Sequence, residues 1–289
     1  MSTPASASGF EPHSGSIDVS GPVERTLEVQ RPARPVNGST AREPPTVDPS
    51  NYPGGKKSLS GISIRAFLLG VTLATCLCIT VFTLTAFPTS LWRVPFFIAS
   101  LCVFHFLEYY VTARYNTLHA NISAFLLSSN GWQYNFAHGS AIAECILFRL
   151  FFPDSYFKWT AAAFGGVKVQ VALGLVLMAV GQTVRTLAMA HAGSNFNHTV
   201  QVERKEGHML VKTGVYSVLR HPSYFGFFWW GLGTQLVLGN VICFLGYTFV
   251  LWMFFSRRIQ REERFLILFF GDEYVDYRRK TWVGIPGIR

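Results

Sequence analysis

Apolar runs separated by polar stretches dominate the chain after residue 60, and their lengths predict helices. The six runs lie at residues 62–87, 91–111, 136–152, 167–190, 224–238 and 241–255. An α-helix of about 20 apolar residues crosses the hydrocarbon core of a bilayer. Only Gly239 and Asn240 separate the last two runs, which predicts a tight helical hairpin. The pattern therefore predicts an all-α integral membrane protein with about six transmembrane helices.

Residues 1–60 differ from the rest of the chain, because they hold nine of its fourteen prolines and few large apolar residues. Such a segment buries too little apolar surface to offset its loss of conformational entropy, so we expect it to be disordered. The chain then divides into three parts. These are a disordered cytosolic tail at 1–60, transmembrane helices 1–4 at 61–195, and a C-terminal region at 196–289 with the hairpin and a charged cytosolic helix.

Charged residues make up 14% of the chain, whereas soluble domains usually carry about 25%. The net charge of +9 is also concentrated: of the 25 Lys and Arg, seven lie in residues 1–65, four in 204–220 and eight in 257–289. Basic residues collect in the cytosolic loops of membrane proteins. Six spans with both termini in the cytosol place all three clusters on that side. The charge thus indicates orientation, and we expect no nucleic-acid partner.

The cysteines all fall within apolar runs; they are Cys76, Cys78, Cys102, Cys145 and Cys243. No CxxC pair occurs, so we interpret them as small core residues. The sequence predicts no disulfide and no metal site.

Ionisable residues also occur inside the predicted spans. His105 and Glu108 are three residues apart and share one helical face. Intramembrane residues of this kind face the bundle interior or a cavity, and the sequence leaves open whether this pair serves function or packing. Glu144 lies in a short run and is expected to be shielded by protein. Arg185 is interpreted as the cytosolic end of the fourth span.

Small residues recur every four positions in the first run, at Ala66, Gly70 and Ala74. A stripe of this kind permits close packing between membrane helices. We expect the stripe to pack against another helix of the same chain, with a homodimer as the alternative.

The polar segment at residues 201–230 is the main candidate for a functional site. It places five polar or aromatic side chains within seventeen residues, namely His208, Tyr216, Arg220, His221 and Tyr224. Polar groups this dense at the edge of an apolar helix are costly unless a ligand or partner satisfies them. Arg258 and Glu262 share one helical face further along, either as a surface ion pair or as part of an anion site. We expect a cofactor pocket in the C-terminal third, completed by these two residues.

A specific combination of motifs lies in this region. RHPSYFGF at 220–227 is followed by RxxxEE at 258–263 and FFGxxYxxY at 269–277, and RTLAMAHAGSNFNHTVQ precedes them. From Gly181 to the C-terminus the chain resembles the isoprenylcysteine carboxyl methyltransferases of the endoplasmic reticulum. The resemblance implies S-adenosylmethionine as methyl donor and the C-terminal carboxylate of a prenylated cysteine as acceptor. The implied partners are farnesylated or geranylgeranylated CaaX-processed proteins, such as small GTPases, or lipidated peptides.

The resemblance also assigns roles by position. The implied cofactor contacts are Gln201, His208, Met209, Leu210, Val211, Tyr216, His221, Pro222, Ser223, Tyr224 and Glu262. Arg258 is implied on the substrate side. The implied location is the endoplasmic reticulum membrane, with several spans and both termini in the cytosol.

The residues agree with this chemistry. A C-terminal carboxyl group has a pKa of about 3.3–3.7, so at neutral pH it is already a nucleophile and needs no general base. The sequence accordingly has no GxSxG nucleophile elbow. Arg258 is the candidate to orient the carboxylate through two parallel hydrogen bonds. The prenyl chain is expected to lie between helices, against Phe227, Phe228, Trp229 and Trp252.

Two other functions remain open from the sequence. Sterol reductases that use NADPH carry an RHPxYxG-like motif near their C-terminal ends. A non-catalytic lipid-binding or scaffold protein would need only the small-residue stripe and the basic tails, but it leaves the polar segment unexplained.

Overall fold

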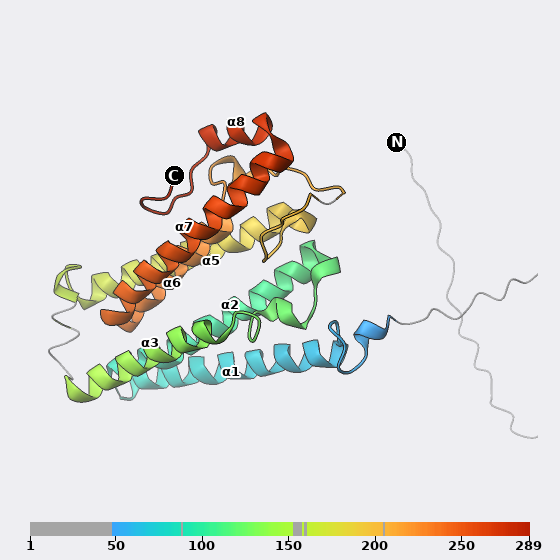
Figure 1. Cartoon of the computed structure of the whole chain (residues 1–289). Coiled ribbons are helices and arrows are strands. Elements are labelled where there is room, and N and C mark those ends of the chain that lie inside the picture. The colour runs from blue at the N-terminus through green and yellow to red at the C-terminus, as the bar shows by residue number, and fades with distance from the viewer. Residues whose placement is uncertain (1–47, 88, 153–157, 159–160, 205) are drawn as a thin grey trace, which may run out of the picture. The chain divides into compact units, whose positions relative to one another are not determined.

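The computed structural model describes residues 48–87, 89–152, 158, 161–204 and 206–289. The chain divides into two compact units, Met1–Thr46 and Val47–Arg289, and the described helices belong to the second. The α-helices of the described residues are α1 Leu59–Thr85, α2 Arg93–Tyr115, α3 Trp132–Phe151, α5 Val167–Ala192, α6 Pro222–Leu238, α7 Ile242–Phe270 and α8 Asp272–Lys280 (Figure 1). Each of the six predicted runs forms a helix, which confirms the all-α prediction.

Four helical segments in the described part of the chain are long and apolar enough to cross a membrane. They are Leu59–Thr85, Ser90–Tyr115, Val167–Asn195 and Ile242–Phe270. The other two predicted spans form the 20-residue α3 and the 17-residue α6. Length and composition therefore support a membrane crossing for four of the six predicted spans.

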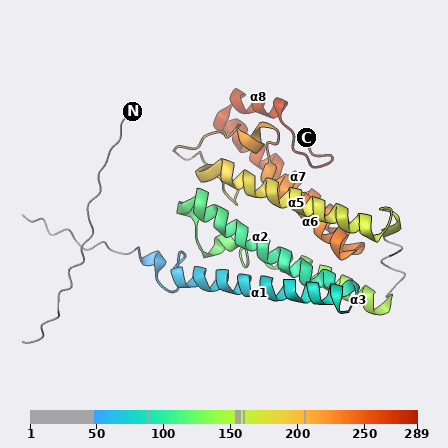
Figure 2. The ribbon, with the colours of Figure 1, turned by 180° about the vertical axis from the view of Figure 1, so that it is seen from behind.

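Helices α5 and α6 lie side by side, as Figure 2 shows from behind, and glycines bring their backbones together. A Cβ atom on Gly181 would lie 2.5 Å from the carbonyl oxygen of Gly226, and one on Gly174 would lie 2.8 Å from that of Gly233. No side chain fits at such distances, so only glycine allows this approach. The contact fixes how residues on α5 face those on α6 near the polar segment.

The small-residue stripe on α1 packs within the chain only in part, because Ala66 contacts the cluster that joins α1 to α2 whereas Gly70 and Ala74 do not. Gly70 and Ala74 are exposed, and a Cβ atom on Gly70 would meet nothing within 4 Å. Helix α1 instead buries Leu69 against Cys102 of α2 and Phe125. The expectation of packing within the chain is wrong for Gly70 and Ala74, because Leu69 and Leu73 face α2 in their place. The homodimer stays a prediction.

Part of the segment predicted to be disordered is folded. Of the expected disordered tail at 1–60, residues 1–47 lie outside the described residues. Residues 48–60 are ordered, because the carbonyl oxygen of Lys56 accepts a hydrogen bond of 2.9 Å from the amide of Ile122. The Ser58 hydroxyl also accepts from the amide of Gly61, which caps α1.

The predicted hairpin between α6 and α7 is confirmed. Gly239 takes a left-handed conformation, with φ of 77°, and ends α6. The carboxylate of Glu144 on α3 accepts hydrogen bonds of 2.6–2.9 Å from the amides of Val241, Ile242 and Cys243. Negative charge at a helix N-terminus is stabilising, so this buried carboxylate ties α3 to the start of α7. Glu144 is thus shielded by protein, as predicted.

The C-terminal segment folds back onto α6 and α7 after α8. Trp229 on α6 donates a hydrogen bond of 3.1 Å to the carbonyl oxygen of Gly284, and Trp252 on α7 donates one of 2.8 Å to that of Pro286. Ile285 and Ile288 are buried in the same apolar cluster as Phe228, Phe255 and Ile259. The tail therefore fixes the polar segment and α7 relative to each other.

Candidate active site

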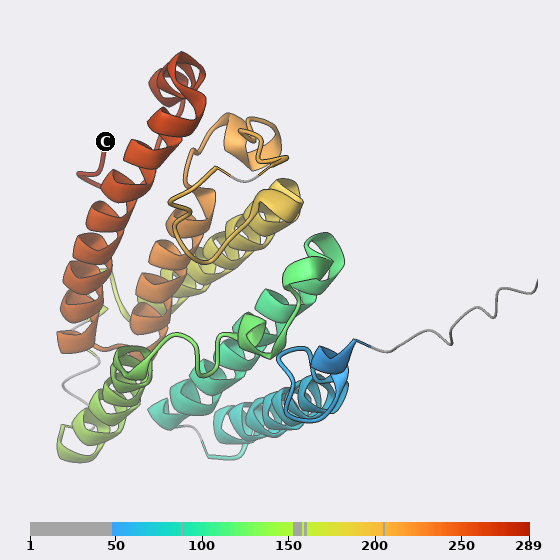
Figure 3. The same ribbon diagram turned by 45° about the vertical axis from the view of Figure 1, so that its right-hand side comes forward.

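A cavity of about 780 Å³ runs between α3, α5, the polar segment, α6, α7 and α8. Helix α7 contributes a residue at every fourth position, namely Ile242, Gly246, Val250, Phe254, Arg258, Glu262, Leu266 and Phe270. Residues four apart are neighbours on a helix surface, but at 3.6 residues per turn each step of four also turns the helix by about 40°. At a rise of 1.5 Å per residue, this row of residues winds around α7 as it follows the cavity for about 42 Å. The site is a long channel along α7, and it is not confined to the C-terminal third, since residues of α3 also line it. Figure 3 shows the ribbon of α3 beside that of α7.

One end of the cavity is polar and aromatic, and it brings together the residues predicted to hold a cofactor. The predicted residues that line it are His208, Met209, Leu210, Val211, Tyr216, His221, Pro222, Ser223, Tyr224 and Glu262. Tyr274 and Tyr277 of α8 lie in the same lining. Gln201 does not line the cavity; its amide donates a hydrogen bond of 3.2 Å to the carbonyl oxygen of Thr199. Its role as a cofactor contact stays a prediction.

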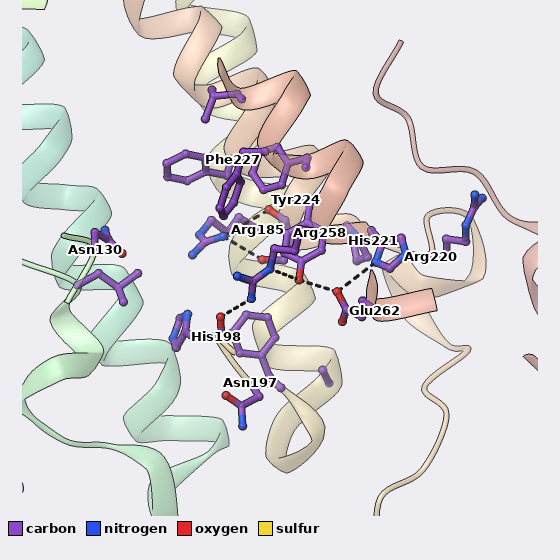
Figure 4. Close-up of a pocket in the computed structure, with 18 of the residues that line it drawn as sticks. Asn130, Arg185, Asn197, His198, Arg220, His221, Tyr224, Phe227, Arg258 and Glu262 are labelled. Atoms are coloured by element: carbon purple, nitrogen blue, oxygen red, sulfur yellow. Dashed lines mark hydrogen bonds and ion pairs between the residues drawn. The ribbon is translucent and has the colours of Figure 1, made fainter. Parts of the chain in front are cut away.

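Arg258 and Glu262 are joined through the hydroxyl of Tyr224, which replaces the simple surface ion pair that their spacing allows. The Arg258 Nε atom donates to this hydroxyl at 2.7 Å, and the hydroxyl donates to the Glu262 carboxylate at 2.6 Å. Arg258 also donates from Nη2 to the carbonyl oxygen of His198 (Figure 4). Its guanidinium lies 5.3 Å from the centre of the Tyr224 ring. The guanidinium is thereby held at one place in the wall.

Glu263, one residue further along α7, anchors the polar segment to this helix. Its carboxylate accepts hydrogen bonds from Arg220 Nε at 2.7 Å and lies 3.2 Å from His221 Nε2, and Arg278 of α8 pairs with it at 3.2 Å. The ring of His221 stacks on that of Tyr224, with centroids 5.5 Å apart. The RHP motif thus positions Tyr224 and, through it, Arg258.

Arg185 also lines the cavity, which the sequence interpretation missed. It forms a buried ion pair with Glu108 of α2, with Nη2 and Oε2 2.9 Å apart, and it donates to the Ser223 hydroxyl at 2.9 Å. The rings of Phe104 and Phe227 lie 5.3 and 5.4 Å from its guanidinium. Arg185 is thus buried within the bundle near the C-terminal end of α5, and its place at the cytosolic end of the span stays a prediction.

The two ionisable residues of the second predicted span, His105 and Glu108, both have partners inside the bundle. Glu108 is 1% exposed and is satisfied by Arg185, while His105 Nδ1 lies 2.8 Å from the carbonyl oxygen of Phe125. Both residues are therefore satisfied within the bundle, and a contribution of the Glu108–Arg185 pair to function stays a prediction. A signal was present in the sequence, because two opposite charges within separate apolar runs are expected to pair in a membrane protein.

His198 and Asn197 are two further lining residues that sequence reasoning did not single out. Burial lowers the pKa of the His198 imidazole from 6.5 to about 4; the nearby Glu108 carboxylate opposes this shift, and Arg185 and Arg258 add to it. At neutral pH the ring is therefore neutral, and the positive charge of the cavity lining comes from the guanidinium groups of Arg185, Arg220 and Arg258.

The lowered pKa of His198 predicts a pH effect on stability. Between pH 6.5 and 4 the unfolded chain binds a proton here that the folded chain does not, so stability falls as the pH falls through this window. We expect the melting temperature of purified protein to fall less from pH 7 to pH 5 in a His198→Gln variant than in the unchanged chain. Equal falls in both proteins would contradict this assignment.

The other end of the cavity is apolar and lies between α3 and α7. Trp132, Phe136 and Ala137 of α3 line it opposite Val250 and Phe254. Phe136 and Val250 are 68% and 54% exposed, so this part is a groove open at the side of the bundle. An open apolar side in a membrane protein faces lipid, which gives a lipid chain direct access to the groove.

Of the four aromatic residues that the sequence analysis placed against a prenyl chain, one lies in the lining of the cavity. Phe227 lines the cavity, whereas Phe228, Trp229 and Trp252 do not. Phe228 is buried in the cluster beneath the C-terminal segment, and both tryptophan indoles donate to carbonyl oxygens of that segment. The returning tail, which the sequence pattern did not reveal, holds these three side chains on the opposite side.

The cavity thus joins a polar, aromatic pocket to an open apolar groove, with Arg258 at the junction. Within a bundle of membrane-length helices, this arrangement defines an intramembrane enzyme for an amphiphilic substrate with an anionic head. Comparison with known proteins narrows this class. The model of the isoprenylcysteine carboxyl methyltransferase (ICMT) family matches residues 172–268.

Relatives agree over most of the chain. It is 43% identical to the protein-S-isoprenylcysteine O-methyltransferase of Saccharomyces cerevisiae, over 83% of this chain and 97% of the relative. The human protein of that name is 38% identical over 79% of this chain and 75% of its own length. A solved structure of a eukaryotic intramembrane Ras methyltransferase, ICMT, matches with a TM-score of 0.70 and 35% identity, over 79% of this chain and 77% of that one. The chain belongs to the isoprenylcysteine carboxyl methyltransferase family.

Proposed function

We infer that the protein is a protein-S-isoprenylcysteine O-methyltransferase. It esterifies the C-terminal carboxylate of farnesylated or geranylgeranylated cysteine on CaaX-processed proteins, with S-adenosylmethionine as methyl donor. The observation that carries this function is the position of Arg258, between the polar pocket and the apolar groove. A carboxylate bound there has the groove on one side for its lipid and the pocket on the other for a methyl donor.

The reaction needs orientation more than acid–base chemistry. A carboxylate oxygen attacks the methyl carbon, the bond from carbon to sulfur breaks, and the electron pair stays on sulfur, so an anion and a sulfonium become a neutral ester and thioether. The carboxylate is ionised at neutral pH, so no base is required. Alignment of the two reactants in one cavity supplies a large part of such catalysis. Arg258 contributes by holding the carboxylate through its planar fork.

The polar pocket suits the methyl donor. When bound, S-adenosylmethionine supplies an activated methyl group on a positively charged sulfur. Glu262 offers a carboxylate for hydroxyl or ammonium groups, and Tyr216 and Tyr224 offer ring faces that attract cations and stack with bases. The segment His208–Val211 lines the pocket beside them, where backbone groups can bind polar edges. These residues would hold the cofactor without any metal.

The open groove between α3 and α7 suits a prenyl chain that is already inserted in the membrane. Such a chain reaches the groove from the side, without leaving the bilayer. We place the cavity on the cytosolic side of the endoplasmic reticulum membrane, with α3 and α6 completing six spans and both termini cytosolic. The three basic clusters support this orientation, since positive charge collects on the cytosolic side.

A methylation assay tests the function directly. Purified protein in detergent receives labelled S-adenosylmethionine with either N-acetyl-S-farnesylcysteine or its geranylgeranyl analogue as acceptor. We expect base-labile methyl ester from both acceptors, and none when the acceptor carboxylate is already blocked as an amide. Absence of product with both acceptors rejects the proposal, and saturable binding of NADPH instead would favour a reductase.

A further inference from the structure

Gly246 occupies a distinctive place in the apolar groove. It belongs to the row of α7 residues that lines the cavity, between Ile242 and Val250. Gly246 is exposed, and a Cβ atom at this position would meet nothing within 4 Å, so the missing side chain leaves open space on the groove side of α7. The hydroxyl of the neighbouring Tyr247 forms a hydrogen bond of 2.7 Å with Nδ1 of His138 on α3. This contact joins α7 to α3 behind Gly246.

The depth of Gly246 can be compared with the length of a prenyl chain. It lies twelve residues from Arg258 on the same helix, which is about 18 Å along the axis. An isoprene unit adds four bonds of about 1.5 Å to an extended chain, or roughly 5 Å. Three units from a thioether level with Arg258 then reach roughly 15 Å and four units roughly 20 Å. The end of the shorter chain lies before Gly246 and the end of the longer chain lies beyond it.

We propose that Gly246 is a determinant of prenyl chain-length specificity, because it leaves room for the fourth isoprene unit of a geranylgeranyl substrate. This inference rests on the proposed function and adds a specificity determinant to it. Beyond Gly246 the α7 lining of the cavity continues only to Ile242 and Cys243, whose amides donate to the Glu144 carboxylate. A side chain added at Gly246 therefore takes space in the last turn of α7 that lines the cavity.

The test fills this space with side chains of increasing size. Initial rates of methyl transfer are measured for Gly246→Ala and Gly246→Leu with the farnesyl and geranylgeranyl acceptors. We expect the geranylgeranyl-to-farnesyl ratio of kcat/KM to fall in the order Gly, Ala, Leu, by at least about tenfold for leucine, because one methylene in a full pocket already changes discrimination by that much. Farnesyl transfer should change by less than about threefold, and it reports that the variant is folded.

Leu245→Phe is the matched control. Leu245 lies at the same depth but is 63% exposed and outside the cavity lining, so its substitution should leave the ratio unchanged. An unchanged ratio in Gly246→Leu, with both acceptors still methylated, overturns the inference and leaves the function intact. Loss of both acceptors in Gly246→Leu with cofactor binding retained also overturns it. If the unchanged chain methylates neither acceptor, the proposed function itself is rejected.

Discussion

Arg258→Ala is expected to lower kcat/KM for the prenylcysteine acceptor by about 100-fold or more, while the Kd for S-adenosylmethionine changes by less than about threefold. A hundredfold loss corresponds to about 2.7 kcal/mol, which is within the range of a lost charged hydrogen-bond pair. The cofactor end keeps its geometry, because the Tyr224 hydroxyl still donates to Glu262 and His221 still stacks on Tyr224. Initial rates and calorimetric titration of the cofactor measure the two effects separately.

Two further variants sharpen this prediction. Arg258→Lys keeps the charge but loses the planar fork, so its activity should stay well below that of the unchanged chain. Arg257→Ala removes a cation from the neighbouring position, which is exposed and does not line the cavity, and should leave both constants near their original values. An equal loss of cofactor affinity and acceptor use in Arg258→Ala would show that Arg258 is not a substrate-positioning residue.

The helices of this fold were predictable because hydrophobic runs of membrane length specify them locally. The hairpin was predictable for the same reason, since Gly239 alone supplies its left-handed turn. The predictions were wrong where a segment distant in sequence determined how side chains pack. Trp229 and Trp252 look like groove residues in the apolar runs, but the returning tail captures their indole groups. No local pattern shows where a tail will dock.

The candidate site was predictable in part for a related reason. Its polar half comes from one continuous segment and one helix, so motif spacing places His221, Tyr224, Arg258 and Glu262 together. The wall that faces α7 comes from α3, which lies far away in sequence. The buried cation Arg185 pairs with the carboxylate of Glu108, which lies 77 residues away in the chain. That pairing depends on the close contact of α5 and α6 at Gly181 and Gly226, which fixes the side of α5 that faces inward. Local hydrophobic periodicity does not predict tertiary contacts of this kind.

Removal of Glu108 from its buried pair with Arg185 is expected to lower both stability and activity. Glu108→Leu leaves the Arg185 guanidinium buried among Phe104 and Phe227 without its carboxylate. Removing one partner of a buried ion pair typically costs about 3–5 kcal/mol, because the other charge stays out of water. We expect a clearly lower melting temperature in detergent, measured by tryptophan fluorescence, together with loss of methyl transfer.

The double variant Glu108→Leu with Arg185→Met separates stability from activity. Replacing a buried pair by apolar residues of similar volume is often neutral, or stabilising by about 1–4 kcal/mol, so the melting temperature should recover. Methyl transfer should remain at least about tenfold reduced, because the cation that Arg185 contributes to the wall of the cavity is lost while its role in packing is replaced. Recovery of both stability and activity would contradict this and reduce the pair to a packing device. Recovery of neither would show that Ser223, which accepts a hydrogen bond from Arg185, also depends on the guanidinium to hold the start of α6.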